Sequence, residues 1–348
     1  MPLLPIKSFM DSPVSLTQMC GSTLSATMLP WLQAGPWYSA LAAFLKKPSG
    51  QCWMLSDGKT AAPAFAVALM TDTLPGRLQS LSNYYSPLAG PQLPEGATPW
   101  QQFSEALGQQ LPQCSELRLS PVKQSQLPPA LLPHWRWHCQ QISSNWTAQT
   151  EDYWQRRPAQ LRNTVRRKTS KLLAAGGHWQ IYRQINPSLR EAYWQVYQRS
   201  WKPSEPSPDF IDSLFDIASA QGSLRLGVLW LDDKPVAVQC WLVAAGTAAI
   251  YKLAQDQSCD HWSPGTVLTG VMVDEVLASD NVSEIDFLTG NDSYKALWMD
   301  QINPLYQLTL YRRDSWPAQW NFHKARLVSW LAHLKATIDR YGAADAER

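Results

Sequence analysis

The four residues Ser263-Pro264-Gly265-Thr266 have the composition of a helix start that can hold an anion. They follow the polar stretch SCDHW and precede the apolar-periodic stretch VLTGVMVDEVLAS. Proline and glycine in the first turn leave backbone N–H groups without an intrahelical acceptor, and glycine leaves room for a ligand. Because the helix dipole favours negative charge there, the turn suits a phosphate or pyrophosphate. The same residues also fit an ordinary capped helix, with Ser263 as the N-cap and no ligand.

A carboxylate inside an apolar strand is the second candidate for chemistry, in the stretch IDFLTGNDSYKALW. Asp286 alternates with Ile285 and Phe287, so its side chain faces the opposite side of the strand. Burial would raise the pKa of Asp286 and suit it to act as a general base toward an amine. An exposed strand carboxylate, or one paired with Lys295 or an arginine, fits the pattern as well.

A third candidate is a cationic helix, because no Asp or Glu occurs between Tyr153 and Arg190. The cations of this stretch cluster near its start, at Arg156, Arg157, Arg162, Arg166, Arg167, Lys168 and Lys171. Spacings of four residues join Arg162 to Arg166 and Arg167 to Lys171, so two neighbouring ridges are cationic. Such a surface suits the phosphates of a cofactor or an acceptor, an anionic membrane, or tRNA. An ordinary solvated helix face has the same appearance.

Four more residues are candidates for the wall of an acceptor site. Tyr251, Lys252 and Asp256 end a strand just before the Ser263 turn, and Trp201 lies in the pair Ser-Trp that precedes a lysine. Solvation of a strand end explains the first three residues equally well.

Periodicity places these candidates on a regular succession of elements in the second half of the chain. Helices are predicted at 152–177, 187–201, 208–222, from the Ser263 turn, at 293–298 and at 315–340. Strands are predicted at 178–185, 223–231, 235–246, 247–256, 283–290 and 305–313, with a turn at Asp232-Asp233-Lys234.

The first half has a weaker pattern and a faint similarity to the second. It predicts helices at 37–45 and 100–111, a strand-turn-strand at 51–70, and a strand at 115–122. The stretches CWMLSDGKTAAPAFAVAL and GVLWLDDKPVAVQCWLV share a strand, an acidic turn with lysine, and an alternating strand. With 348 residues, two domains are expected, 1–145 and 146–348, joined near 140–150. The predicted fold class is α/β (α+β), with mixed, mostly antiparallel sheets flanked by helices.

Composition excludes several classes of protein. The formal net charge of +2 gives no bulk attraction for DNA, so any basic partner surface is local. Six scattered cysteines without a CxxC, and six histidines without an HExxH, predict reduced thiols and no metal site. No apolar run approaches the ~18 residues of a membrane span, and the start lacks a signal-peptide pattern. These features predict a cytoplasmic protein without Ser-His-Asp, P-loop or GxGxxG chemistry.

The order of elements and four short motifs resemble the GNAT acyltransferase superfamily. The motifs are RLGVLWLDDKPVAVQ, IYKLAQD, SPGTVL and IDFLTGNDSYKALW, in that order. They resemble the GNAT branch of bacterial polysaccharide and cellulose gene clusters, which is related to the Fem-type peptidyltransferases. The resemblance covers about 150–315, and the first half matches only in outline as a second, degenerate unit. It therefore implies tandem GNAT-like domains, with the site in the second.

The resemblance implies transfer of an acyl group, acetyl by expectation, from a coenzyme A thioester. Ser263, Pro264, Gly265 and Thr266 would bind the donor pyrophosphate, although a more usual basic, glycine-rich turn is absent. Arg162, Arg166 and Arg167 would bind donor phosphates. Asp286 would act as base, Tyr294 would protonate the departing thiolate, and Lys295 would complete the catalytic set. Trp201, Tyr251, Lys252, Asp256 and Trp298 would contact substrate.

The implied acceptor is an amine or hydroxyl of a sugar, a sugar nucleotide or a polysaccharide precursor. The partner would be a polysaccharide synthase complex at the inner membrane, with the chain cytoplasmic or peripheral to that membrane. Two alternatives stay open: a Fem-like transferase that takes an aminoacyl group from tRNA, and a non-catalytic scaffold of a polysaccharide-secretion machine. The sequence does not distinguish N- from O-transfer, and it gives neither the acyl chain nor the oligomeric state.

Overall fold

The computed structural model describes Trp37, Ala40, Leu41 and the residues 52–56, 66–93, 96–290 and 292–346. Within these residues the chain forms two compact units. The first unit contains 52–142 and the residues from 304 onward, and the second contains 143–303 with Trp37, Ala40 and Leu41. The predicted helix at 37–45 lies largely outside the described residues.

The strands and helices of the first unit surround one apolar core. The strands are β1 (Cys52–Ser56), β2 (Ala66–Thr71), β3 (Arg77–Ser80), β4 (Glu116–Lys123), β11 (Gln301–Arg312) and the first part of β5 (Trp135–Gln149). The helices are α4 (Ala97–Gln110), the 3₁₀ turn η2 (Gln124–Gln126) and α10 (Trp316–Ala346). The strand order is β1-β2-β3-β4-β11-β5, and only the β3–β4 pair is parallel among the printed registers. Helix α4 buries Trp100, Phe103 and Leu107 in this core.

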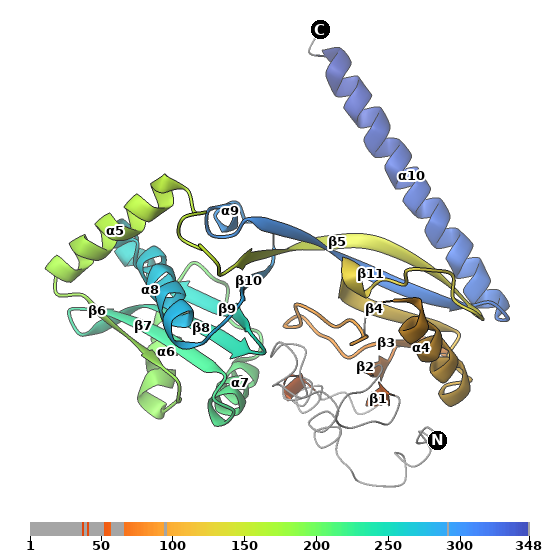
Figure 1. The fold of residues 1–348 in the computed structure, drawn as a ribbon, viewed down its shortest axis with the longest axis horizontal. Helices are drawn as coiled ribbons and strands as arrows, with labels where there is room; N and C mark the ends of the chain where they lie inside the picture. Colours follow the sequence, from red (N-terminus) through yellow and green to blue (C-terminus); the bar gives the residue numbers. More distant parts are fainter. Residues whose placement is uncertain are drawn as a thin grey trace. The chain divides into compact units, whose positions relative to one another are not determined.

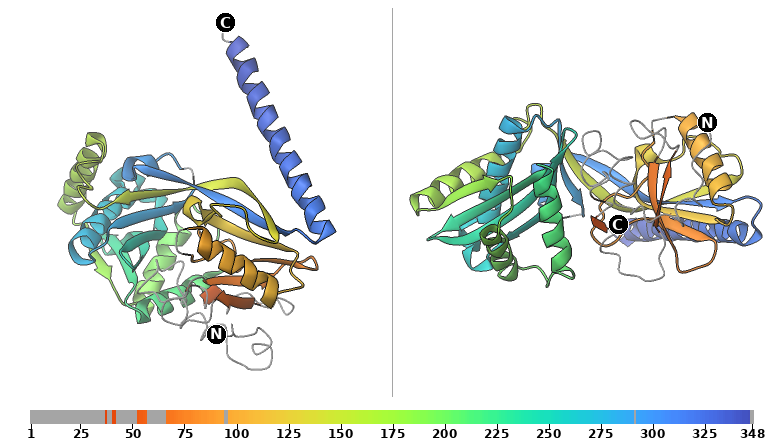
Figure 2. Two further views of the ribbon diagram at one scale, coloured as in Figure 1. Left: turned by 45° about the vertical axis from the view of Figure 1, so that its right-hand side comes forward. Right: turned by 90° about the horizontal axis from the view of Figure 1, so that it is seen from below.

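The second unit is a sheet with helices on both faces (Figures 1 and 2). Its strands are the end of β5, then β6 (His178–Tyr182), β7 (Leu224–Leu231), β8 (Lys234–Ala244), β9 (Thr247–Gln255) and β10 (Glu284–Thr289). Its helices are α5 (Ala159–Ala174), α6 (Pro187–Gln198), α7 (Pro208–Ala220), η3 (Gln257–Trp262), α8 (Pro264–Ser279) and α9 (Lys295–Trp298). The strand order is β5-β10-β9-β8-β7-β6, and every pair except β9–β10 is antiparallel. The predicted fold class, mixed and mostly antiparallel sheets flanked by helices, is confirmed.

Local chemistry sets the ends of these elements as the sequence predicts. Asn186 begins α6 by accepting a hydrogen bond from the Leu189 N–H at 2.9 Å, and Pro187 occupies the first helical position. The β7–β8 hairpin turns at Asp232 and Asp233, both with positive φ, as a tight turn between right-twisted strands requires.

The core of the second unit lies between the sheet and helices α5 and α8. Trp241 and Leu229 from the sheet meet Val267, Met272 and Val273 from α8, and all five side chains are fully buried. Each such side chain contributes about 1.5–3 kcal/mol on burial. Packing therefore fixes α8 firmly against β7, β8 and β9.

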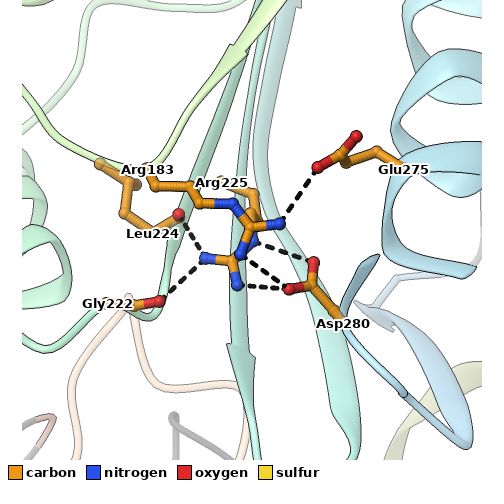
Figure 3. A network of polar contacts seen from close by, with 6 residues as sticks. All are labelled: Arg183, Gly222, Leu224, Arg225, Glu275 and Asp280. Atoms are coloured by element: carbon orange, nitrogen blue, oxygen red, sulfur yellow. Dashed lines mark hydrogen bonds and ion pairs between the residues drawn. The ribbon is translucent and has the colours of Figure 1, made fainter. Parts of the chain in front are cut away.

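A buried ion-pair network ties the C-terminal end of α8 to strand β7 (Figure 3). The guanidinium of Arg225 donates to both carboxylate oxygens of Asp280, at 2.9 and 2.5 Å, and to the carbonyls of Gly222 and Leu224. Arg183 also pairs with Asp280, at 3.2 Å. The carboxylate at this helix end is thereby fully compensated.

Two expectations about the division of the chain differ from the structure. The predicted join near 140–150 is the uninterrupted strand β5, which begins in the first unit and ends in the second. The residues from 304 onward belong to the first unit, not with 146–303, because β11 pairs with β4. The order of the predicted strands along the sequence does not indicate that the chain comes back to the first unit after residue 303.

Candidate functional site

The candidate site lies at the carboxyl end of β9, beyond the residues that pair with strand β10. The two strands pair in parallel only over their first three residues, from Thr247 beside Glu284 to Ala249 beside Asp286. Beyond that point the register of β10 with β5 shifts at a bulge, and Leu288 takes a φ of 57°. Among the described residues, no strand pairs with the last residues of β9 on the β10 side.

A pocket of about 390 Å³ lies at the end of β9. Its lining comes from β8, the end of β9, the start of α8, the start of α5, the α9 segment and Trp201: Gln160, Leu161, Thr164, Trp201, Gln239, Leu253, Ala254, Gln255, Gly265, Thr266, Thr269, Tyr294, Leu297 and Trp298. Among these residues there is no Lys, Arg, Asp, Glu or His. The pocket therefore offers hydroxyls, side-chain amides and apolar walls, without a charged group.

Two of the four turn residues, Gly265 and Thr266, line the pocket, while Ser263 and Pro264 do not. Ser263 has the left-handed backbone conformation (φ 56°, ψ 51°), and its side chain does not cap the helix. Proline lacks an N–H, the Gly265 N–H donates to Gln255 Oε1 at 2.8 Å, and the Val267 N–H donates to the Ser263 carbonyl. Among the described residues, no acceptor is found for the Thr266 N–H. Of the backbone N–H groups that were expected to bind an anion at this turn, only that of Thr266 has no acceptor among the described residues.

Gln239 is a pocket residue that sequence reasoning missed. It is 1% exposed, and its Nε2 donates to Thr269 Oγ1 at 2.7 Å and to the Gly265 carbonyl at 3.2 Å. Its Oε1 accepts from Trp241 Nε1 at 2.9 Å. These bonds fix the start of α8 against β8. A glutamine inside the apolar strand PVAVQCWLV is the signal that could have revealed it, since buried amides need dedicated partners.

Three predicted residues, Tyr294, Trp298 and Trp201, come together at this pocket. Burial, with a smaller effect of Asp292, raises the pKa of Tyr294 to about 12, so its phenol is protonated at neutral pH. Trp298 is held because its carbonyl accepts hydrogen bonds from Tyr153 and Arg157.

The indole of Trp201 is 53% exposed and lies 5.8 Å from the Nζ of Lys202. Burial, reinforced by the cation of Lys252, lowers the pKa of Lys202 to about 8. A lysine that changes charge near neutral pH therefore stands next to one wall of the pocket. The sequence alone shows only that this lysine follows Trp201.

Asp286 and Lys295 are both 4% exposed and do not line the pocket. Asp286 accepts a hydrogen bond from the Leu288 N–H at 2.7 Å and one from Asn145 Nδ2 at 3.2 Å. Lys295 donates to the carbonyls of Phe287 and Thr289, and burial lowers its pKa. Both side chains bind the bulged backbone of β10. The catalytic roles proposed for them stay predictions.

The strand-end residues lie away from the pocket. Lys252 forms an ion pair with the buried Glu205 at 2.9 Å, and Tyr251 packs edge-on against Trp37. Asp256 accepts hydrogen bonds from the backbone N–H and the hydroxyl of Ser258, and it forms an ion pair with Arg199. Asp256 lines a different pocket of about 680 Å³. Their roles as substrate contacts stay predictions.

Helix α5 has two different faces. Its inner residues Gln160, Leu161 and Thr164 line the pocket. The three arginines that were expected to bind the donor, Arg162, Arg166 and Arg167, are exposed, and none forms an ion pair with any described residue.

Two lysines of the same helix fasten it to η3. Lys168 donates to the His261 carbonyl at 2.8 Å, and the Lys171 ammonium lies 4.7 Å from the ring centroid of Trp262. These contacts hold the cationic helix next to the segment that leads into α8.

One part of the chain is similar to a known domain family. Residues 159–296 match the family model of the acetyltransferase (GNAT) domain. The matched residues run from α5 through β10 to the start of α9, and they contain most of the pocket lining. No curated protein matches the sequence significantly.

Solved structures with the same fold extend over most of the chain. FemX superposes with a TM-score of 0.60 and 8% identity, over 85% of this chain and 96% of FemX. The C-terminal domain of a protein designated a lysylphosphatidylglycerol synthetase from Agrobacterium fabrum gives 0.54 and 12%, over 90% and 95%. The L-PGS structure from Bacillus licheniformis gives 0.51 and 12%, over 87% and 92%. At such identities the likeness establishes the fold alone.

Proposed function

We propose that this protein is an acyltransferase that moves an acyl group, acetyl by expectation, from a coenzyme A thioester to an amine or hydroxyl. The carrying observation is the uncharged pocket between the end of β9, the start of α8 and the start of α5, with the Thr266 N–H at the start of α8. A pocket with apolar walls and neutral polar groups suits a thioester and its pantetheine arm. The match of residues 159–296 to the GNAT domain family supports the same reaction class.

Catalysis in such a pocket would rest on positioning rather than on a charged base. The acceptor nitrogen or oxygen attacks the thioester carbonyl carbon, the new bond to carbon forms, and the carbon–sulfur bond breaks. The acceptor loses its proton to water, because the pocket lining holds no carboxylate or imidazole. A backbone or side-chain N–H directed at the carbonyl oxygen would stabilise the charge that develops there.

Tyr294 would assist the departing thiolate through a hydrogen bond. With a pKa of about 12, its phenol is a weaker acid than an ordinary thiol of pKa about 8.5. Complete proton transfer to the thiolate is therefore uphill, and the expected protonation becomes stabilisation by a donated hydrogen bond. The thiolate then collects its proton from solvent.

The proposed acceptor is a sugar, a sugar nucleotide or a polysaccharide precursor, handled with a polysaccharide synthase complex at the inner membrane. Support comes from the sequence resemblance and from the three glutamines and three threonines of the lining, which are neutral partners suited to hydroxyl groups. A cytoplasmic location, or one peripheral to that membrane, belongs to the same proposal.

A second candidate is transfer of an aminoacyl group from tRNA. Arg162, Arg166 and Arg167 favour it, because they are exposed, form no ion pair with a described residue, and make a ridge that suits a nucleic-acid backbone. The fold shared with FemX is compatible with it.

Calorimetric titration with acetyl-CoA, free CoA and aminoacyl-tRNA tests these candidates on the full chain. A Cβ at Gly265 would lie 2.3 Å from Gln255 Oε1, so Gly265→Trp fills the pocket mouth. Gly108→Trp is the matched control, because a Cβ at Gly108 meets nothing within 4 Å.

Saturable acetyl-CoA binding that is lost in Gly265→Trp and kept in Gly108→Trp supports the thioester donor. Binding of aminoacyl-tRNA without acetyl-CoA replaces it with the second candidate. If the folded wild type binds neither donor, both are wrong, and the non-catalytic scaffold remains.

A further inference from the structure

The apolar side chains by which helix α10 packs on the first unit lie along one face, while Asn321 and His323 make polar contacts with Glu116 and Arg136 from other positions. Ala318 and Phe322 are buried, and Phe322 packs edge-on against Tyr311 of β11. Further along, the Ser329 hydroxyl lies 3.0 Å from His138 Nε2 of β5. The packed face therefore follows positions 318, 322, 325 and 329, which is the spacing of one helix side.

The opposite face carries large apolar side chains that remain exposed. They are Trp316 (75%), Trp320 (62%), Leu327 (55%), Trp330 (59%), Leu331 (49%) and Leu334 (43%). At about 100° per residue these six lie within roughly 60° of Leu327 around the helix axis. We call them the α10 stripe; it is about 27 Å long at ~1.5 Å per residue. The rings of Trp316 and Trp320 stack at its beginning.

The stripe is bordered by positive charge and by no negative charge. Lys324, Arg326 and Lys335 are exposed on the same helix, and the sequence contains no Asp or Glu from 315 to 338. A second copy of this helix would bring like charges to both edges, which is unfavourable in a helix pair. The complementary surface is therefore anionic as well as apolar.

We propose that α10 docks on an anionic lipid surface through the α10 stripe. Tryptophan and leucine on one face, with flanking Lys and Arg, are the features of a helix that lies in a membrane interface. None of the described helices is long and apolar enough to cross a bilayer. The stripe would therefore hold α10 parallel to the surface, with Ala318 and Phe322 still packed on the first unit. This inference does not depend on which donor the pocket takes.

Vesicle sedimentation with the full chain tests the proposal. Vesicles of phosphatidylcholine with about one third phosphatidylglycerol are compared with phosphatidylcholine alone. We expect binding to the anionic vesicles, with a blue shift of tryptophan emission. Replacing Lys324, Arg326 and Lys335 with Gln should weaken binding roughly fivefold per cation at low salt.

Substitution of the stripe is the decisive arm. Trp320→Ser with Leu331→Ser should reduce vesicle binding by at least tenfold, because both side chains lose their insertion into the interface. Tyr84→Ser with Leu131→Ser is the matched control, since these residues of the first unit are 82% and 81% exposed. Far-UV circular dichroism checks that the helix is retained, which is expected because neither change touches its packed face.

Four outcomes would overturn the proposal. The first two are equal binding to neutral and anionic vesicles, and no binding at all. The third is unchanged binding of the stripe variant. The fourth is loss of binding when Arg162, Arg166 and Arg167 are changed to Gln, which would assign docking to α5. If the wild type does not bind vesicles but forms a dimer that the stripe variant abolishes, the occupant is a second copy. If neither lipid nor a second copy occupies the stripe, pull-down with acidic helical peptides tests a protein partner.

Discussion

The two ends of α8 use polar groups in opposite ways. At the C-terminal end, Asp280 is almost completely buried, and it is surrounded by the guanidinium groups of Arg225 and Arg183 (Figure 3). A carboxylate is unfavourable at the negative end of a helix dipole. The two arginines compensate the negative charge of Asp280. Arg183 follows β6 and Arg225 lies in β7, so these ion pairs join the end of α8 to both strands and stabilise the fold.

The N-terminal end carries no charge in its pocket lining. Polar groups there are glutamine amides, threonine hydroxyls and one open backbone N–H, and the positive end of the helix dipole faces the pocket. Neutral groups can be desolvated by a ligand at much smaller cost than ionised ones. The comparison indicates that the C-terminal end is built to be permanent and the N-terminal end is built to exchange its partner.

The largest effect is expected on removing the carboxylate of the permanent end. Asp280→Ala leaves Arg225 buried without a counter-charge, and we expect a loss of about 3–5 kcal/mol in the free energy of unfolding. Urea denaturation measures it. Glu275→Ala is the control, because Glu275 pairs only with the half-exposed Arg183 and should cost at most about 0.5 kcal/mol. Equal losses in both variants would contradict the structural role of Asp280.

The next largest effect concerns the phenol at the exchanging end. Tyr294→Phe removes a hydrogen-bond donor to the departing thiolate, so kcat should fall about 10- to 100-fold. Because the pKa of Tyr294 is raised to about 12, the phenol keeps its proton and the wild-type rate should not fall from this group up to pH 10. A fall in rate centred on pH 10 that Tyr294→Phe removes would show that burial does not hold the proton. An unchanged kcat would exclude the role.

Regular elements of the second unit were predictable because each depends on local pattern. The sequence predicts strands at 223–231, 235–246 and 247–256, and the structure has them at Leu224–Leu231, Lys234–Ala244 and Thr247–Gln255. Strand β3 was missed because four residues are too few for a periodic signal. The sequence predicts a boundary between domains near 140–150, within strand β5. The middle of this strand, QQISSN, is polar, and it is a strand because it pairs with β10 and β11, which are far away in the sequence.

The sequence predicts part of the pocket lining but not its hydrogen bonds. Composition indicated the turn at Gly265, and the family resemblance implied Tyr294 and Trp298, and all three line the pocket. The side chain of Gln255 accepts a hydrogen bond from the N–H of Gly265, ten residues later in the sequence. No local sequence pattern reveals this contact. The burial inferred for Asp286 is observed, but the bulge that turns its carboxylate onto backbone depends on pairing with β5.

A smaller effect is expected at Asp286. Asp286→Asn keeps the shape but removes the charge that the Leu288 N–H and Asn145 contact, so stability should fall by about 1–2 kcal/mol while kcat changes less than about threefold. Asp292→Asn is the control, because its carboxylate is 59% exposed and should be nearly neutral. Urea denaturation and steady-state kinetics are measured on the same samples. A 100-fold loss of kcat with loss of the acidic limb of the pH profile would instead establish Asp286 as the general base.

The smallest effect tests the exchange of partners itself. If a donor phosphate takes the amides at the start of α8, it must displace Gln255 Oε1 from the Gly265 N–H. Gln255→Ala removes that competitor, and the Kd for CoA should tighten about fivefold, the value of one hydrogen bond of ~1 kcal/mol. Gln160→Ala, another lining glutamine that is not bonded to α8, should leave the Kd unchanged or weaken it slightly. Weaker binding in Gln255→Ala alone would mean that this glutamine contacts the ligand directly, so the helix start would not exchange one acceptor for another.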